Sequence, residues 1–368
     1  MIGDSKRKLL EDLTDVDFIS ICGTTWNLMG VEAWLVGQER ADNHLKGIVC
    51  IRKHKDTGYT INKSFFENSG YNVKSIEENE YFNESFRDKL FRRVFTLIYL
   101  IGWKRLSKDS KISKDLYILC LGGLDQTWIV PLKAIPSGIK ITFVIVDDGY
   151  MNPILEGSKV GYPYRRLVDY LIRKKFDVVD RRLRIPTKKY ECTFNESCID
   201  DYLDCFQKHG KMIDRELLDK YNDSIIICTQ PLPGLSGTDY EAYGKVSEIL
   251  RKHNLKNIVR MHPREKDVER YSKLGFIVDD SGKDKYTIEA VIANLEKRPK
   301  CVVSIYSSVL SDVGMFFNIP AISIARLIPK NMMDKETSKI IEMTLEAQEA
   351  NWLIPSSYSE LERCLLML

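Results

Sequence analysis

Short apolar runs that end in small or polar residues alternate with helical patterns along most of the 368-residue chain. A short apolar run closed by a turn is typical of a buried strand, whereas a period near 3.6 residues is typical of a helix. The alternation fills two blocks, one over residues 17–146 and one over 224–324. Because strands that alternate with helices form parallel sheets with helices on both faces, the sequence predicts an α/β protein with two Rossmann-like halves.

The length supports this division, since a domain typically holds roughly 100–200 residues. The expected strands are 17–22, 47–52, 71–76, 116–121 and 140–146 in the first block and 224–228, 257–261, 275–278, 301–305 and 320–324 in the second. We expect a Rossmann-like domain over 1–155, a basic helical connector over 156–222, a second Rossmann-like domain over 223–335 and a helical tail over 336–368 that crosses back. Clefts between domains are preferred ligand sites, so the halves are predicted to face one another across a cleft.

Composition excludes several classes of protein. The hydrophobic share of 44% and charged share of 29% are ordinary for a soluble globular chain, and the net charge of +3 is too small to indicate a nucleic-acid binder. The nine cysteines form no CxxC pair and no zinc-type cluster, which favours buried reduced thiols. The N-terminus has no signal-peptide pattern, and the longest apolar run, 94–103, is about half of a membrane span. We expect a cytoplasmic protein, soluble or peripherally attached to the membrane.

The run 258–263, Ile-Val-Arg-Met-His-Pro, predicts a strand that delivers His262 to its carboxyl end. Proline cannot donate to a sheet ladder, so the strand should stop before Pro263. In open α/β sheets, ligands bind beyond the carboxyl ends of the strands. His262 is therefore a candidate for catalysis, although a histidine at a strand end also occurs as a structural hydrogen-bonding group.

Polar residues at other junctions between strands and helices each have a functional and a structural interpretation. The adjacent carboxylates of Asp147 and Asp148 suit a general base or a metal ligand, but Asp147-Asp148-Gly149 also suits an acidic turn. Ser307 and Ser308 suit a helix cap and equally a phosphate site at the start of a helix. Asp239 opens the helix expected over 239–253, either as its cap or as a rival base.

Two further stretches have both a structural and a functional interpretation. Gly23 and Thr24 follow the first strand, where they can cap a helix or present hydroxyl and N–H groups to a ligand. Residues 162–190 hold ten basic and three acidic residues, a local net charge of +7. This stretch is either a solvated helix face with a connector or a docking surface for an anionic lipid or acceptor.

Several motifs are missing. The chain has no Walker-type loop, no GxGxxG after its first strand and no HExxH. Its only Asp-x-Asp, Asp15-Val16-Asp17, precedes a strand rather than following one, which weakens the case for a transferase in which a carboxylate pair holds Mg²⁺. No metal site and no cofactor are therefore expected.

Taken together, these motifs resemble those of bacterial sialyltransferases, and most closely glycosyltransferase family 52, which includes lipooligosaccharide and capsule sialyltransferases. The resemblance covers most of the chain and rests on an acidic-acidic-Gly motif, a His-Pro motif and a Ser-Ser motif in that order. It runs through 21–28, Asp147-Asp148-Gly149, Thr229-Gln230-Pro231-Leu232, 261–265 and 304–308.

The resemblance implies a GT-B fold and an inverting, metal-independent transfer of sialic acid from CMP-sialic acid (CMP-Neu5Ac) to a galactose-type sugar of a surface glycan. It implies that His262 protonates or hydrogen-bonds the departing phosphate and that Asp239 is the base, although related families favour Asp147 or Asp148. Those two would otherwise shape the acceptor side. The implied donor-binding residues are Thr229, Gln230, Pro231, Pro263, Glu289 (toward the ribose), Ser307 and Ser308.

Two other functions fit the same residues. One is a GT-B transferase that uses another nonulosonic acid or a UDP-hexose, and the other is a non-catalytic protein that binds glycan or anionic lipid. The expected partners are a CMP-sugar donor, an oligosaccharide or glycolipid acceptor and an anionic membrane surface at Arg165–Lys189. A homodimer is left open, and no nucleic acid is expected.

Overall fold

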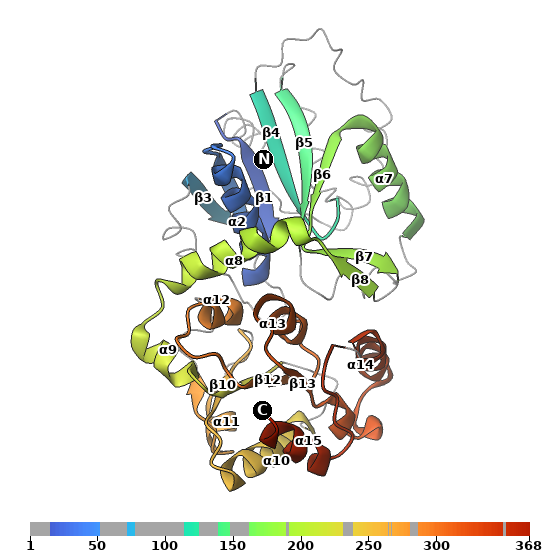
Figure 1. Ribbon diagram of the computed structural model, residues 1–368. Coiled ribbons are helices and arrows are strands. Elements are labelled where there is room, and N and C mark those ends of the chain that lie inside the picture. The colour runs from blue at the N-terminus through green and yellow to red at the C-terminus, as the bar shows by residue number, and fades with distance from the viewer. Residues whose placement is uncertain are drawn as a thin grey trace. The chain divides into compact units, whose positions relative to one another are not determined.

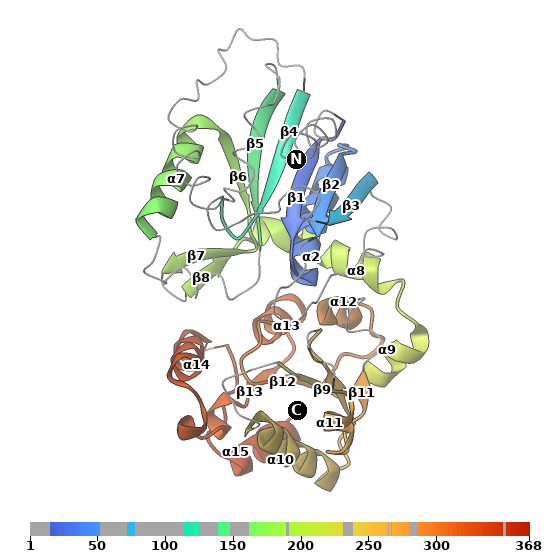
Figure 2. The same ribbon diagram turned by 180° about the vertical axis from the view of Figure 1, so that it is seen from behind.

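The chain divides into two compact units, Met1–Tyr202 (unit 1) and Leu203–Leu368 (unit 2). The computed structural model describes residues 15–51, 72–77, 114–124, 139–147, 162–188, 191–230, 238–263, 265, 267–279, 286–348 and 351–368. Each unit is built around its own parallel sheet (Figures 1 and 2).

The sheet of unit 1 has six parallel strands in the order β3-β2-β1-β4-β5-β6. The strands are β1 (Phe18–Cys22), β2 (Lys46–Ile51), β3 (Asn72–Glu77), β4 (Lys114–Leu121), β5 (Ile139–Val146) and β6 (Asp177–Arg181). This is the strand order of the Rossmann fold, in which the chain order reverses between the first and fourth strands. Ligands of such sheets bind at the carboxyl ends of the strands beside this reversal, called the switch point.

Burial explains why these runs form strands. All five residues of β1 are buried, as expected for a central strand covered on both faces. The ring of Phe18 lies directly over Gly47 of β2, where an added Cβ would come within 2.1 Å of the ring. Glycine at this position therefore allows the aromatic ring to pack against the neighbouring strand. On α2 (Thr25–Arg40), ten consecutive residues from Asn27 to Val36 are buried.

The stretch 156–222, expected as a basic connector, contributes to both units. α7 (Tyr162–Lys175) leads into β6, which pairs in parallel with β5 and extends the sheet of unit 1 (Figure 1). β7 (Arg184–Lys188) and β8 (Glu191–Phe194) form an antiparallel pair, and α8 (Glu196–Gly210) contains the division between the units. α9 (Arg215–Tyr221) belongs to unit 2.

The sheet of unit 2 has five parallel strands in the order β11-β10-β9-β12-β13, which repeats the strand order of unit 1 without its last strand. The strands are β9 (Ile225–Cys228), β10 (Asn257–Arg260), β11 (Val278–Asp279), β12 (Cys301–Ser304) and β13 (Ala321–Ser323). The helices are α10 (Thr238–Lys252), α11 (Glu269–Ser272), α12 (Ile288–Ala293), α13 (Val309–Phe317), α14 (Lys335–Gln348), α15 (Tyr358–Leu366) and the 3₁₀ turns η3 (Ala325–Leu327) and η4 (Lys330–Met332). The switch point of unit 2 lies between β9 and β12.

The helical tail belongs to unit 2. α15 is joined to α10 through Glu362, whose carboxylate accepts from Lys252 at 2.7 Å and lies 2.5 Å from the His253 ring. The predicted return of this tail to the N-terminal domain stays a prediction.

The expected α/β class with two Rossmann-like units is confirmed. The long helix expected over 86–106 lies outside the described residues, and the facing of the two halves across a cleft stays a prediction. Among the residues that the structure describes, no helix has both the length and the apolar character needed to span a membrane.

Candidate functional site

Polar residues gather at the carboxyl edge of the sheet in unit 2. Thr229 follows β9, His262 follows β10 and Ser307 follows β12, and these three strands are neighbours in a parallel sheet. Since the carboxyl ends of parallel strands meet at one edge, these residues lie beside the switch point, where α/β sheets bind ligands.

His262 begins a tight turn after β10. The N–H of Glu265 donates to the carbonyl oxygen of His262 at 2.9 Å, which closes a four-residue turn with Pro263 in its second position. Proline is favoured there because its fixed φ matches the turn. The His262 N–H itself is directed at the Thr229 hydroxyl, 3.1 Å away, and at Oε2 of Glu265, also 3.1 Å away. The turn thus fixes the backbone of the histidine, whose side chain stays half-exposed.

Glu265 collects donors from three elements. Its Oε2 accepts from the Thr229 hydroxyl as well as from the His262 N–H, and its Oε1 accepts from the Tyr271 hydroxyl at 2.7 Å. Burial, followed by the charge of Glu265, raises the pKa of Tyr271 well above its usual range, so this phenol remains a donor. Neither Glu265 nor Tyr271 was a candidate site residue from the sequence.

Asp239 lies in the first turn of α10 and is buried. Its Oδ1 accepts from Arg270 at 2.8 Å, and Arg270 lies over the rings of Tyr240 and Tyr271. Burial lowers the pKa of the Arg270 guanidinium, but the attraction of Asp239 leads the opposing causes, so the pKa is raised overall. Asp239, Arg270, Tyr271 and Glu265 therefore form a chain of contacts that ends at the backbone of His262.

The paired serines lie at the start of α13. Ser307 is buried, and its hydroxyl accepts from the Val309 N–H at 3.4 Å. Ser308 occupies the cap position but makes no capping bond through its side chain. On the other side of the switch point, Oε1 of Gln230 accepts from the Tyr306 N–H at 3.4 Å, which ties the end of β9 to the turn before the serines. A helix start with hydroxyl groups suits a phosphate.

Glu289 is buried on α12, in a helix that Thr287 caps by accepting from the Ala290 N–H at 3.2 Å. Burial and then the charge of Glu289 raise the pKa of the Cys228 thiol to about 12. The carbonyl of Tyr286, just before α12, accepts from Arg260 at the end of β10, so Glu289 in the first turn of this helix lies near the carboxyl edge of the sheet.

In unit 1, Asp147 follows β5 and is enclosed by donors. Its Oδ1 accepts from Arg184 at 2.8 Å and from the indole N–H of Trp26 at 3.1 Å, and its Oδ2 accepts from the Arg184 N–H at 2.8 Å. The guanidinium of Arg184 also lies 5.1 Å from the Trp26 ring, and the two charged side chains are 1% and 2% exposed. A Cβ on Gly30 of α2 would come within 3.0 Å of the Asp147 carbonyl oxygen, so the helix also packs tightly on this residue.

Gly23 and Thr24 form the N-cap of α2. The Thr24 hydroxyl accepts from the Asn27 N–H at 3.2 Å, and the Asn27 side-chain oxygen accepts from the N–H groups of Gly23 and Thr24, both at 3.0 Å. This reciprocal capping box uses the N–H groups that the sequence analysis considered for a ligand.

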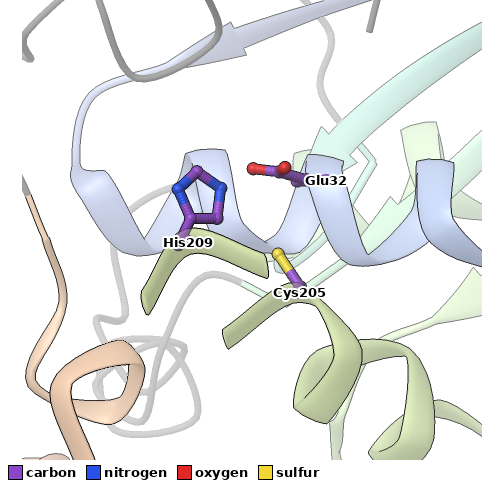
Figure 3. A group of neighbouring side chains, drawn as sticks. All are labelled: Glu32, Cys205 and His209. Atoms are coloured by element: carbon purple, nitrogen blue, oxygen red, sulfur yellow. The ribbon is translucent and has the colours of Figure 1, made fainter. Parts of the chain in front are cut away.

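The helix α8 has buried side chains on both sides of the division between the units, which lies between Tyr202 and Leu203. Asp201 accepts from Arg40 at 2.6 Å and also pairs with Arg181, so it anchors the helix within unit 1. Figure 3 shows Cys205 and His209 pointing to the same side of α8, one turn apart, and both are buried. Glu32, also drawn in Figure 3, is a buried carboxylate of α2.

The structure brings Thr229, His262 and, through the Arg270 chain, Asp239 into one network, with Gln230, Glu289 and the serines on the same sheet edge. Asp148, Gly149 and Pro231 lie outside the described residues. Sequence reasoning missed Glu265, Arg270 and Tyr271 in unit 2 and Trp26 and Arg184 in unit 1. Of these, Glu265 and Trp26 lie within the stretches 261–265 and 21–28 that carry the resemblance, whereas Arg184, Arg270 and Tyr271 lie outside all of them.

Residues 196–326 match a family model described as alpha-2,8-polysialyltransferase (POLYST). This segment is little more than a third of the chain, and it contains every donor-side residue considered above. The match supports a glycosyltransferase of the sialyltransferase type, while family 52 in particular is not confirmed. No curated protein matches the chain in sequence.

Solved structures share the fold at low identity. A UDP-GlcNAc 2-epimerase from Neisseria meningitidis bound to UDP-GlcNAc has a TM-score of 0.50 and 12% identity, covering 95% of this chain and 90% of that one. A Listeria monocytogenes protein described as a UDP-N-acetylglucosamine 2-epimerase has a TM-score of 0.50 and 10% identity, covering 96% of this chain and 88% of that one. A sialyltransferase from Photobacterium damsela is 14% identical over 92% and 81% of the chains, with a TM-score of 0.46 that carries no weight. The first two likenesses support the GT-B class of fold and say nothing about activity.

Proposed function

We propose that this chain is an inverting, metal-independent sialyltransferase that moves sialic acid from CMP-sialic acid to a galactose-type sugar of a surface glycan such as lipooligosaccharide or capsule. One observation carries the proposal. The segment matching the polysialyltransferase model is the segment that places Thr229, His262 and Ser307 on one edge of a parallel sheet, beside its switch point.

On the donor side, His262 faces the departing CMP phosphate and donates a proton or a hydrogen bond to it. Ser307 and Ser308 bind the same phosphate at the start of α13, where the helix dipole favours an anion. Glu289 hydrogen-bonds the ribose, and Gln230 and Pro263 line the donor side. These groups offset the negative charge that develops on the phosphate, which is the main electrostatic demand of the reaction.

On the acceptor side, Asp239 removes the proton from the acceptor hydroxyl. The acceptor oxygen then forms a bond to C2 of sialic acid while the bond from C2 to the phosphate oxygen breaks, and CMP leaves. Arg270 holds Oδ1 of Asp239, so we assign the proton to the second carboxylate oxygen, Oδ2. Positioned proton transfer of this kind contributes on the order of 10²–10⁴-fold to a rate.

The family match favours a second candidate acceptor. A protein resembling alpha-2,8-polysialyltransferases would transfer sialic acid onto a chain that already ends in sialic acid. The donor chemistry is the same in both cases, and only the acceptor differs.

The α7 helix suits an anionic membrane surface, which would bring the enzyme to a glycolipid acceptor. Val168 and Ile172 point into the core of unit 1, whereas Leu167 and Tyr170 are 46% and 59% exposed. Lys174 lies 6.0 Å from the centre of the Tyr170 ring, so apolar and basic groups share the outer side. Such a combination is typical of helices that lie on anionic lipid.

Membrane docking is tested by sedimentation with vesicles that contain phosphatidylglycerol or only phosphatidylcholine. We expect binding to the anionic vesicles alone, falling steeply with salt, and weaker binding after Tyr170→Ser. Met332→Ser, at a residue 41% exposed in unit 2, is the matched control. Binding that is absent, or unaffected by salt, would return α7 to the role of a solvated helix.

The function is tested by incubating the protein with CMP-sialic acid and either a lactose-type or a sialic-acid-ended acceptor, with the product linkage read by NMR. Product on lactose supports the first acceptor, and an α2,8-linked product on the sialylated acceptor supports the second. Transfer from a UDP-hexose, with none from CMP-sialic acid, would contradict the sialyl assignment. An absence of transfer from all donors, with glycan binding retained, would support the non-catalytic alternative.

A further inference from the structure

Glu265 differs from the other carboxylates of the sheet edge because its donors come from the ends of two neighbouring strands. Thr229 follows β9, His262 follows β10, and Tyr271 belongs to α11, which comes after the His-Pro turn. One side chain therefore joins the residues that flank the donor side of the switch point. The inference drawn from this geometry rests on the proposed function.

The hydrogen-bond directions restrict what each partner does. The Thr229 hydroxyl donates to Glu265 and accepts from the His262 N–H. Its single hydrogen is thereby used within the protein rather than offered to a donor phosphate. The high pKa of Tyr271 keeps its phenol a donor, so the second oxygen of Glu265 is also satisfied.

We propose that Glu265 is a positioning residue that fixes the backbone of His262 and the hydroxyl of Thr229, so that the imidazole meets the departing phosphate. Glu265 holds both backbone groups of His262, because its N–H donates to the His262 carbonyl and its carboxylate accepts from the His262 N–H. A displacement of about 1 Å at a reacting group costs on the order of 10²-fold in rate. Glu265 thus acts through His262 and not on the substrate.

Two substitutions separate positioning from a need for negative charge. In Glu265→Gln, the amide oxygen can still accept from Thr229 and His262 while the amide N–H₂ donates to Tyr271, so the turn is retained. In Glu265→Ala, all three donors lose their acceptor. We expect kcat to fall about 10–10²-fold in the alanine variant and less than about 5-fold in the glutamine variant, with KM for CMP-sialic acid within about 3-fold in both. The exposed Glu269, paired with Lys273 on α11, provides the control Glu269→Ala.

The His262→Ala background shows whether the effect passes through the histidine. If Glu265 acts by positioning His262, Glu265→Ala lowers kcat by less than about 3-fold in that background, because coupled residues are not additive. An equal loss in both backgrounds, a loss in KM alone, or equal losses in the alanine and glutamine variants would each overturn the proposal.

A readout without turnover keeps this test separate from the proposed function. The chain has five histidines, and the ring NMR signal of His262 is assigned by its loss in His262→Ala. We expect Glu265→Ala to shift or broaden that signal and to leave the signals of the other four histidines unchanged. The control Glu269→Ala should leave the His262 signal where it is in the wild type. An unchanged His262 signal overturns the positioning role whether or not the wild type transfers sugar. An inactive wild type whose His262 signal moves as expected contradicts the proposed function alone.

Discussion

Asp147 of unit 1 and Asp239 of unit 2 are both buried carboxylates and both candidates for the base, and they are held very differently. Asp147 of unit 1 has three donors from Arg184 and Trp26, and its ion pair is almost completely buried. Among the described residues, Asp239 of unit 2 pairs through one oxygen, with Arg270, whose side chain is 29% exposed. A carboxylate whose oxygens are filled by protein donors stabilises the fold, whereas one with an oxygen to spare is suited to accept a proton. The comparison favours Asp239 over Asp147 as the base.

The largest expected effect is on the stability of unit 1. Asp147→Asn leaves the buried guanidinium of Arg184 without its counter-charge, and breaking a buried ion pair costs about 3–5 kcal/mol. We expect the free energy of unfolding of this unit, measured by urea denaturation, to fall by that amount.

The control for this variant is Asp177→Asn, which breaks an exposed pair with Lys140 on the same sheet. Exposed pairs contribute about 0–1 kcal/mol, so little change is expected. Equal losses in the two variants would show that Asp147 is not the anchor of this region.

The second effect is on turnover. Asp239→Asn should lower kcat on the order of 10²–10⁴-fold, because it removes the proposed proton acceptor. The measurement is steady-state transfer from CMP-sialic acid, and Glu241→Gln, at an exposed residue two positions along the same helix, is the control. Near-normal turnover of Asp239→Asn would move the base elsewhere, and Asp148, which the structure does not describe, would become the next candidate.

A smaller effect is expected on stability when Arg270, rather than Arg184, is replaced. Arg270→Gln should lower the free energy of unfolding by about 1 kcal/mol, because Arg270 is 29% exposed, so solvent screens its pair with the buried Asp239. Arg184→Gln should cost several times more, because it leaves Asp147 buried without its partner. Similar losses in urea denaturation would remove the distinction between an anchored and an adjustable carboxylate.

The smallest effect concerns the thiol at the end of β9. Because the pKa of Cys228 is raised to about 12, the thiol stays protonated at pH 8 and becomes a thiolate only as the pH approaches that value. We expect iodoacetamide at pH 8 to leave Cys228 unmodified in the native protein while it reaches the half-exposed Cys364, as read by peptide mass spectrometry. Equal alkylation of both cysteines would contradict the burial and the raised pKa of the Cys228 thiol.

Much of the fold was predictable because burial on both faces of a parallel sheet leaves continuous apolar runs in the sequence. Ile225–Cys228 and Cys301–Ser304 are completely buried, and both lie in apolar runs that were expected to be strands. The placement of His262 followed from the same logic, since Pro263 ends the run. β6 was missed because Asp177–Arg181 is an edge strand with two acidic residues and one basic residue, which resembled the charged connector around it.

The partners of the site residues were not predictable in the same way. Arg184 lies 37 residues from Asp147 and was one of ten basic residues in its stretch, so no local pattern marked it as a buried ion-pair partner. Glu265 was visible in the motif after His262, but its role depends on Thr229 and Tyr271, which only the folded chain brings to it. Side-chain pairing between distant elements is decided by tertiary packing, which periodicity does not encode.

The claim that the carboxyl edge of unit 2 holds a CMP-activated sugar is tested most directly by calorimetric titration of the protein with CMP and with UDP. If the claim holds, CMP binds, UDP binds at least about 10-fold more weakly, and Ser308→Ala weakens the binding of CMP. Binding of UDP without binding of CMP would contradict it.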